Sequence, residues 1–274
     1  MTTKEIRNNA AEFTEEYHGN YLTADEVISF EYIGMKIFDT PIFAFGYVND
    51  ELYEKYKSPD VIGNHFLTPI EWLPNAKTVI SFFLPYTETI RLANARDYKW
   101  PADEWLHGRY EGQKFLKNLA VNLKQLLQEA GFESLIPTVD PRFGVGNADP
   151  KSKSKFTSNW SERHVAYACG LGTFGLSKGI ITEKGMCGRL GSILTELDLP
   201  KDNRPYKKIY EYCTMCGVCI SHCPAQAISF AEGKDSLLCS DFVNKVHKKS
   251  RPRYGCGKCQ VGVPCESKRP ASKS

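Results

Sequence analysis

The sequence predicts an α+β fold in two parts, residues 1–200 and 201–274. In the first part, apolar runs of strand length alternate with amphipathic helical patterns, which indicates a packed α/β domain. In the second part, eight of the ten cysteines follow one another between Cys213 and Cys265. A linker rich in proline and lysine, residues 199–208, separates the two parts.

The first half of the chain supplies a polar helix, two strands and a long helix. Residues 1–30 read as helical and polar, whereas 41–48 and 77–84 are β-rich apolar runs, the second of which predicts a buried strand. The stretch 110–132 predicts the clearest helix, with Gly131 as its C-terminal cap. Its apolar stripe consists of Phe115, Leu119, Leu123, Leu126, Leu127 and Ala130.

Residues 134–140 predict a strand that ends at Asp140. A long polar loop follows it, and loops of this length are often functional. A short helix is expected over 161–169, with Ser161 as its N-cap, and a further strand over 189–197.

Charge is distributed unevenly along the chain. The net charge is only +3, yet nine Lys and Arg residues stand against one acid, Glu266, from Lys245 onward. The N-terminus lacks the apolar core of a signal peptide, and no apolar run reaches about 18 residues. We therefore expect a cytoplasmic protein that does not span a membrane.

The stretch "ACGLGTFGLSKG" contains the G-x-G-x-x-G pattern of a dinucleotide-binding turn at Gly170, Gly172 and Gly175. A nucleotide fold needs a strand before the first glycine and a helix after the last. Here a helix is expected before Gly170, and the three further glycines after Gly175 argue against a helix. The pattern therefore favours turns or a close approach of the backbone to a flat, bulky group.

The stretch "CTMCGVCISHCP" has the C-x2-C-x2-C-x3-C-P spacing of bacterial ferredoxins. The alternatives are structural zinc, which usually uses two separated C-x2-C pairs, and disulfides. Four cysteines so close together, followed by proline, favour an iron–sulfur cluster. By the ferredoxin rule, the fourth cysteine ligates a second cluster.

Eight cysteines suffice for two [4Fe-4S] clusters. The ferredoxin rule assigns Cys213, Cys216, Cys219 and Cys265 to one cluster, called the first cysteine group below. It assigns Cys223, Cys239, Cys256 and Cys259 to the other, the second cysteine group. Cys265 follows Cys259 by x5 rather than x3. Cys169 is expected to be a buried free thiol, and Cys187 remains unassigned.

The order of motifs resembles the epoxyqueuosine reductase family, which is related to the reductive dehalogenases. The resemblance rests on "LPNAKTVISFFLPY", "VD", "ERHVAYACGLGTFG" and "GRLGSILTELDL", followed by the ferredoxin run. It covers about residues 70 to 265. The segment after the glycine turn departs from the family, because Gly175 is followed by Leu-Ser rather than Lys-Asn.

The resemblance implies a nitroreductase-like α/β domain that holds base-off cobalamin, followed by a ferredoxin-like domain with two clusters. It implies that Asp140 donates a proton to the substrate, which requires burial to raise its pKa. Asp140 has an alternative role as a turn residue, and Tyr110 and Tyr167 are alternative donors. The implied cofactor contacts are Gly170, Gly172, Thr173, Phe174, Gly175 and Ser177.

The resemblance thus implies an oxidoreductase that takes electrons from ferredoxin or flavodoxin and reduces a small electrophile. Two alternatives stay open: a flavin in place of cobalamin, and an electron-transfer protein that activates the corrinoid of a partner. The basic residues near the cysteines favour docking of an acidic donor, with tRNA as the less favoured partner. These residues are Lys245, Lys248, Lys249, Arg251, Arg253 and Lys258.

Overall fold

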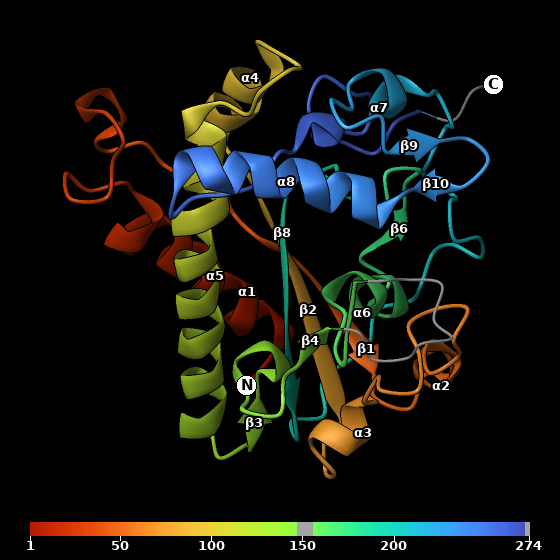
Figure 1. The fold of residues 1–274 in the computed structure, drawn as a ribbon. Helices are drawn as coiled ribbons and strands as arrows, with labels where there is room; N and C mark the ends of the chain where they lie inside the picture. Colours follow the sequence, from red (N-terminus) through yellow and green to blue (C-terminus); the bar gives the residue numbers. More distant parts are fainter. Residues whose placement is uncertain (147–155, 272–274) are drawn as a thin grey trace.

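The computed structural model describes residues 1–146 and 156–271. A four-stranded antiparallel sheet lies at its centre, in the order β1–β2–β8–β3 (Figure 1). The strands are β1 (Ile42–Tyr47), β2 (Thr78–Pro85), β8 (Gly188–Thr195) and β3 (Ser134–Leu135). The sequence thus predicted β1, β2 and β8 to within two residues at each end.

Helices cover both faces of the sheet, so β2 is buried along its whole length. On one face, Ile80 and Phe82 pack in a cluster with α1 (Thr3–Glu16) and α5 (Asp103–Glu129). On the other, Val79 and Phe83 pack in a cluster with α2 (Glu51–Tyr56) and α6 (Glu162–Cys169). The alternation of a strand's side chains therefore separates two apolar cores.

The long helix begins at Asp103, earlier than the expected Tyr110. Gly108 and Gly112, which weaken a helix locally, lie inside it because the aromatic side chains beneath leave no room. A Cβ on Gly108 would lie 3.0 Å from Tyr86, and one on Gly112 would lie 2.9 Å from Phe38. At the other end, Gly131 has φ +88° and ends the helix as the sequence predicted.

Two expected elements are shorter than predicted. The N-terminal helix stops at Glu16, and β3 has only two residues before the 3-10 turn η3 (Pro137–Val139). Pro137 cannot donate a strand hydrogen bond, which accounts for the early end of β3. As a result, residues 188–193 of β8 have β2 on one side, and the described residues supply no strand on the other.

The cysteine-rich part packs over one end of the sheet, where α8 (Ser236–Ser250) crosses in front of α5 (Figure 1). It also contains α7 (Val218–Ser221), β9 (Ile228–Ser229), β10 (Gly233–Lys234) and η4 (Lys258–Gln260). The other elements are α3 (Pro69–Trp72), α4 (Glu88–Ala95), β4 (Val145–Gly146), β5 (Thr157–Ser158), β6 (Gly172–Phe174), β7 (Ile180–Thr182), η1 (His18–Asn20) and η2 (Phe30–Tyr32). Across the residues that the structure describes, every helix is too short or too polar to cross a membrane.

Candidate functional site

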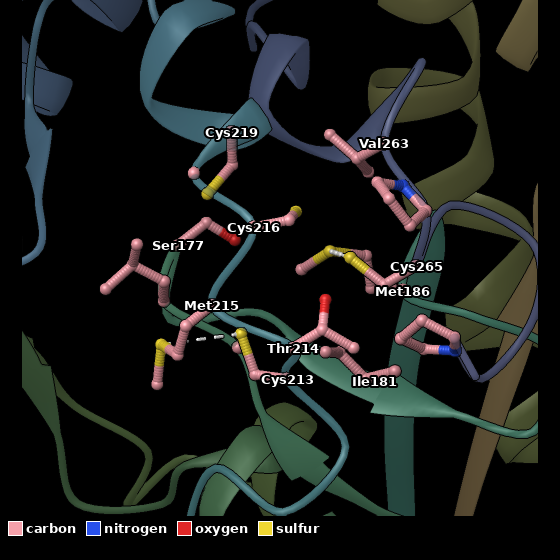
Figure 2. Close-up of a pocket in the computed structure, with 15 residues that line it drawn as sticks. Ser177, Ile181, Met186, Cys213, Thr214, Met215, Cys216, Cys219, Val263 and Cys265 are labelled. Atoms are coloured by element: carbon pink, nitrogen blue, oxygen red, sulfur yellow. Dashed lines mark hydrogen bonds between the residues drawn. The ribbon is translucent and has the colours of Figure 1, made fainter. Parts of the chain in front are cut away.

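The four cysteines of the first cysteine group line one pocket (Figure 2). Three of them come from the ferredoxin run, and Cys265 arrives from the C-terminal segment, where its thiol donates to Met186 Sδ at 3.4 Å. Of the described residues that line this pocket, none is charged. Its apolar walls include Leu176, Ile181, Val263 and Pro264.

The ferredoxin run winds around this pocket because its backbone takes left-handed conformations. Met215 has φ +48° and Gly217 has φ +78°, and the single turn of α7 begins directly after Gly217. Cys223 lies beyond α7, and the backbone N–H of Ala227 donates to its sulfur at 3.3 Å. Hydrogen bonds of this kind to cluster sulfurs adjust reduction potentials.

The second cysteine group is also assembled. Burial is the largest cause that raises the pKa of Cys256 to about 12, and the thiols of Cys259, Cys239 and Cys223 raise it further. For Cys265, burial raises the pKa to about 12, and the additional contributions come from members of the first group. Cys256 is thus influenced by Cys259, Cys239 and Cys223, and Cys265 by Cys213, Cys219 and Cys216, while Cys219 is influenced by Cys259 as well as by its own group.

Among the described residues, no three His, Cys, Asp or Glu side chains are placed to hold a single metal ion. A cubane cluster makes a different demand, because each of its four thiolates binds a different iron atom. The C-x2-C-x2-C spacing of the ferredoxin run suits such a cluster better than a zinc ion, whose sites usually use two separated C-x2-C pairs.

The glycine segment forms a hairpin of β6 and β7 rather than a nucleotide-binding turn. No helix follows Gly175, which agrees with the exclusion of a dinucleotide fold. A Cβ on Gly172 would collide with the backbone oxygen of Ile181 across the hairpin. We expected Gly172 to admit a flat cofactor, but its close approach is to the protein itself.

The other residues of this segment join the two parts of the chain. Thr173 is fully buried, and its hydroxyl accepts from the backbone N–H of Tyr212 at 2.9 Å. The N–H of Phe174 donates to the Ile209 carbonyl at 2.8 Å. Gly170 ends α6 with φ +93°. Gly175 and Ser177 line the pocket of the first cysteine group, so the hairpin forms a wall of that pocket.

Asp140 is held by Arg142. Its carboxylate accepts from Nε at 2.8 Å and from Nη2 at 3.0 Å, and the Arg142 guanidinium lies over the Trp72 ring. The side-chain hydrogen bond from Arg142 is the main cause that lowers the pKa of Asp140. A proton donor requires a raised pKa, so the structure shows the opposite of the shift that this role needs.

The sequence did not indicate a role for Glu162, yet its pKa is raised, as we expected for Asp140. Both carboxylate oxygens of Glu162 are buried, and the Ser192 hydroxyl and the Trp160 indole N–H lie close enough to lower its pKa, although neither makes a well-formed hydrogen bond to it. Burial raises its pKa to about 7. An acidic residue in the first turn of a helix is ordinarily exposed to solvent and interacts with the helix dipole. In the sequence, only Trp160, two residues earlier, indicated an apolar environment.

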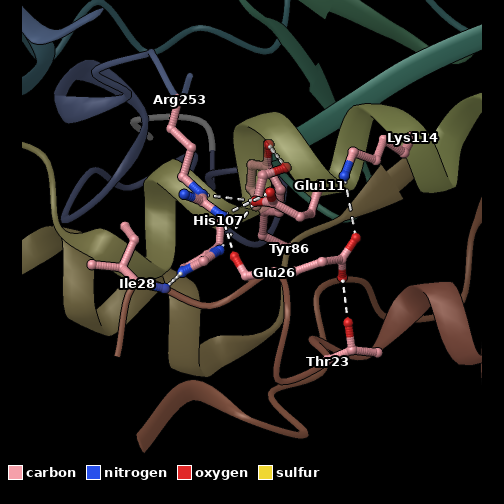
Figure 3. Close-up of polar contacts among 9 residues, drawn as sticks. Thr23, Glu26, Ile28, Tyr86, His107, Glu111, Lys114 and Arg253 are labelled. Carbon is pink, nitrogen blue, oxygen red and sulfur yellow. Dashed lines mark hydrogen bonds and ion pairs between the residues drawn. The ribbon is translucent and has the colours of Figure 1, made fainter. Parts of the chain in front are cut away.

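A buried polar network fastens the C-terminal segment to α5 (Figure 3). Glu111 accepts from Arg253 Nε at 3.1 Å and Nη2 at 2.9 Å, and lies 3.0 Å from His107 Nδ1. The N–H of Ile28 donates to His107 Nε2, which leaves Nδ1 as the protonated nitrogen of a neutral ring. Burial alone would raise the pKa of Glu111, but hydrogen bonds from His107 and Arg253 outweigh it and lower the pKa.

We expected six basic residues near the cysteines to form a surface, but two of them are not at the surface. Arg253 is 12% exposed and paired with Glu111, and Lys258 is fully buried, with Nζ donating to Asn94. Neither side chain can meet a partner at the surface. The four exposed cations that remain are Lys245, Lys248, Lys249 and Arg251.

The two cysteines outside the groups are both buried. Burial raises the pKa of Cys169 to about 12, and its thiol lies 3.8 Å from the Tyr53 hydroxyl. Burial likewise raises the pKa of Cys187. Both thiols are therefore unreactive in this structure.

Comparison with known proteins agrees with this site. The model of a 4Fe-4S binding domain matches residues 206–229, which contain the ferredoxin run. An epoxyqueuosine reductase from Bacillus cereus is 28% identical over 76% of this chain and 53% of its own length. A tetrachloroethene reductive dehalogenase from Desulfitobacterium hafniense is 32% identical over 38% of this chain and 20% of its own length.

The fold is also shared with a solved reductive dehalogenase whose structure was interpreted in terms of B12-dependent dehalogenation. It aligns with a TM-score of 0.51 at 13% identity, over 84% of this chain and 30% of the other. The chain thus spans about half the length of the first curated relative and less of the others. On these sequence matches, this chain is a relative of epoxyqueuosine reductase and of the reductive dehalogenases.

Proposed function

We propose that this protein is a cobalamin-dependent iron–sulfur oxidoreductase that takes electrons from an external donor and reduces a small electrophilic substrate. The observation that carries the proposal is the pocket that Cys213, Cys216, Cys219 and Cys265 line together with the β6–β7 hairpin. Two [4Fe-4S] clusters, a nitroreductase-like first domain and a domain boundary near residue 200 belong to this proposal.

Orphaned buried polar atoms support a bound cofactor beside β8. Residues 188–193 have no neighbouring strand on their second side among the described residues. One guanidinium nitrogen each of Arg109 and Arg189 is buried without a partner, and the charges of Arg109 and Glu162 both act on Arg189. Such atoms are costly unless a ligand satisfies them. A corrin ring with amide side chains offers both a broad apolar face and many hydrogen-bonding groups.

Cobalamin, when bound, would supply the cobalt-centred reduction chemistry that no side chain can perform. The chain would contribute binding, exclusion of water and a proton. Glu162 can hold a proton near neutral pH in this structure, whereas Asp140 can do so only after it leaves Arg142. We therefore propose Glu162 as a proton-holding group and keep Asp140 as a donor that depends on a rearranged loop.

Anaerobic titration with cob(II)alamin tests the cofactor assignment. We expect the EPR spectrum of base-off cobalamin, since the sequence has no D-x-H-x-x-G box to supply a histidine ligand. Tight flavin binding without cobalamin binding would overturn the proposal in favour of a flavin enzyme. Turnover that requires a second corrinoid protein would favour the activating role instead.

The pH dependence of stability tests the role of Glu162 without any cofactor. Its folded-state pKa of about 7 lies above the usual 4.5, so the free energy of unfolding should fall as pH rises from about 4.5 to 7. Glu162→Gln should flatten this fall and stabilise the protein by about 3 kcal/mol at pH 8. Asp140→Asn is the matched control and should leave this pH window unchanged. If the free energy of unfolding of Glu162→Gln depends on pH as that of the wild type does, the carboxyl of Glu162 is solvated.

A further inference from the structure

Two arginines from different elements lie on the face of the sheet that α5 covers. Arg109 projects from α5, and Arg189 is the second residue of β8. Burial and, next, the positive charge of Arg109 lower the pKa of Arg189 to about 10, so the two guanidinium groups lie close together. Placing two like charges together in a buried setting is unfavourable unless an opposite charge offsets them.

Residues 1–146 and 156–271 do not provide that opposite charge at close range. Nη1 of Arg109 and Nε of Arg189 are buried without a hydrogen-bond partner. The negative charge of Glu162 reaches Arg189, but it is the weakest of the influences found there. Within the described ranges, the arginines that form ion pairs lie elsewhere in the chain: Arg7, Arg91, Arg96, Arg142, Arg204 and Arg253.

Neighbouring groups hold both side chains in position. The guanidinium of Arg109 lies 4.6 Å from the centre of the Tyr254 ring, and Gly255 lets the backbone pack against its methylene stem. Arg189 donates from Nη2 to Gln113, one helical turn after Arg109 on α5. Both arginines therefore keep donors in place that no described residue uses.

We propose that Arg109 and Arg189 form a binding site for an oxyanion, either a carboxylate or a phosphate. The planar guanidinium groups match the paired oxygens of such anions, and the buried setting strengthens the interaction. Because Arg189 belongs to β8, the strand beside which the cofactor is proposed to bind, the anion can belong to the substrate. This last step rests on the proposed function, whereas the oxyanion site stands without it.

Thermal unfolding of the cluster-containing full chain tests the site with inorganic phosphate and with benzoate. Chloride at equal ionic strength is the reference. An anion at about 100 times its Kd should raise Tm by about 5 °C or more. Arg109→Gln and Arg189→Gln should each abolish the shift. In the absence of anion, both variants should unfold at a temperature equal to or higher than that of the wild type, because a buried like-charge pair is removed.

Arg96→Gln is the matched control, since Arg96 is 74% exposed and already pairs with Glu104. It should keep the full shift. The proposal is overturned if neither anion shifts Tm in the wild type, or if the shift persists in both variants. Should Arg189→Gln not fold, Arg109→Gln alone decides, since Arg109 makes no hydrogen bond through Nη1.

Preloading the protein with a corrinoid distinguishes the two sources of the anion. Cobinamide lacks the nucleotide loop and its phosphate, which cobalamin carries. If cobalamin removes the response to phosphate and cobinamide leaves it, the site holds the phosphate of the cofactor. If both leave it, the site serves the substrate, which then carries an anionic group. If the chain binds no corrinoid, the proposed function fails, while the Tm shift still tests the oxyanion site.

Discussion

The two cysteine groups have the same number of thiols but different surroundings. No charged side chain among the described residues lines the pocket of the first group. In the second group, Lys258 lies between Cys256 and Cys259 in the sequence. Its side chain is fully buried, and its Nζ donates to Asn94. Lys234 stands beside it as well, and the charge of Cys259 is the main cause that raises the pKa of Lys234. Ligand spacing thus sets where a cluster can form, while neighbouring charges set how readily each cluster is reduced.

Replacement of one cysteine in each group is the strongest test of this division. Cys216→Ser and Cys239→Ser should each remove about half of an expected total of about eight iron atoms. The two variants should differ in which cluster remains visible by EPR. Iron and sulfide analysis of anaerobically prepared protein provides the measurement. Loss of all iron in either variant, or stoichiometric zinc in the wild type, would contradict two independent clusters.

Gly172 in the β6–β7 hairpin allows a second test of the difference between the two cysteine groups. In Gly172→Val, the new side chain would collide with Ile181 and force β6 and β7 apart, at a cost of about 1–3 kcal/mol. We expect lower stability and selective loss of the first cluster. Gly144→Val is the control, because a Cβ at Gly144 meets no atom within 4 Å. An intact first cluster with weakened cobalamin binding would favour direct contact between Gly172 and the cofactor.

The sequence predicted features that nearby residues determine and missed features that depend on distant segments of the chain. The spacing of the ferredoxin run and the apolar run of β2 are local patterns; the second correctly predicted the central strand, and the three cysteines of the first that belong to the first group line one pocket with Cys265. The start of α5 was missed because Gly108 is explained by Tyr86, directly after β2, and by Ile90 of α4. Contacts between distant segments cannot be read from local periodicity.

The two carboxyl groups show the same limit. Asp140 at the end of a predicted strand suggested a buried acid, but Arg142, two residues later, satisfies it. Glu162 is poised near neutral pH because the sheet and Trp160 bury it, which is a consequence of the assembled fold. Likewise, Arg253 and Lys258 belong to a basic stretch in the sequence, yet the structure places them inside.

The charge beside the second group should alter its reduction potential. Replacing Lys258 by Met removes a buried positive charge, so the reduced cluster loses a stabilising interaction. We expect one potential to fall by tens of millivolts, on the order of the interaction between charges several ångströms apart at an effective dielectric constant near 20. Redox titration followed by EPR measures this shift. Lys258→Arg is the charge-preserving control, and equal shifts at both clusters would show that the two groups share one electrostatic environment.

The smallest expected effect concerns the exposed cations at the C-terminal end of α8, the helix that carries Cys239 of the second group in its first turn. Lys248, Lys249 and Arg251 are exposed, and Lys249 lies over the Trp100 ring at 4.8 Å. A positive surface attracts an acidic ferredoxin or flavodoxin and raises its association rate, an effect that salt screens over about 8 Å at physiological ionic strength. We therefore propose that electrons enter near the second group.

Reversal of these three residues to Glu should slow reduction by ferredoxin and flatten its dependence on salt, because steering acts before contact. Reduction by dithionite should be unchanged, since a small reductant does not need the docking surface. The matched control replaces Lys4, Lys55 and Lys77 by Glu; all three are exposed, and they lie on α1, on α2 and just before β2. This control makes the same change in net charge at a different place, so it separates local docking from overall charge. If the α8 variant accepts electrons from ferredoxin at the normal rate but loses affinity for tRNA, then the surface binds nucleic acid and electrons enter elsewhere.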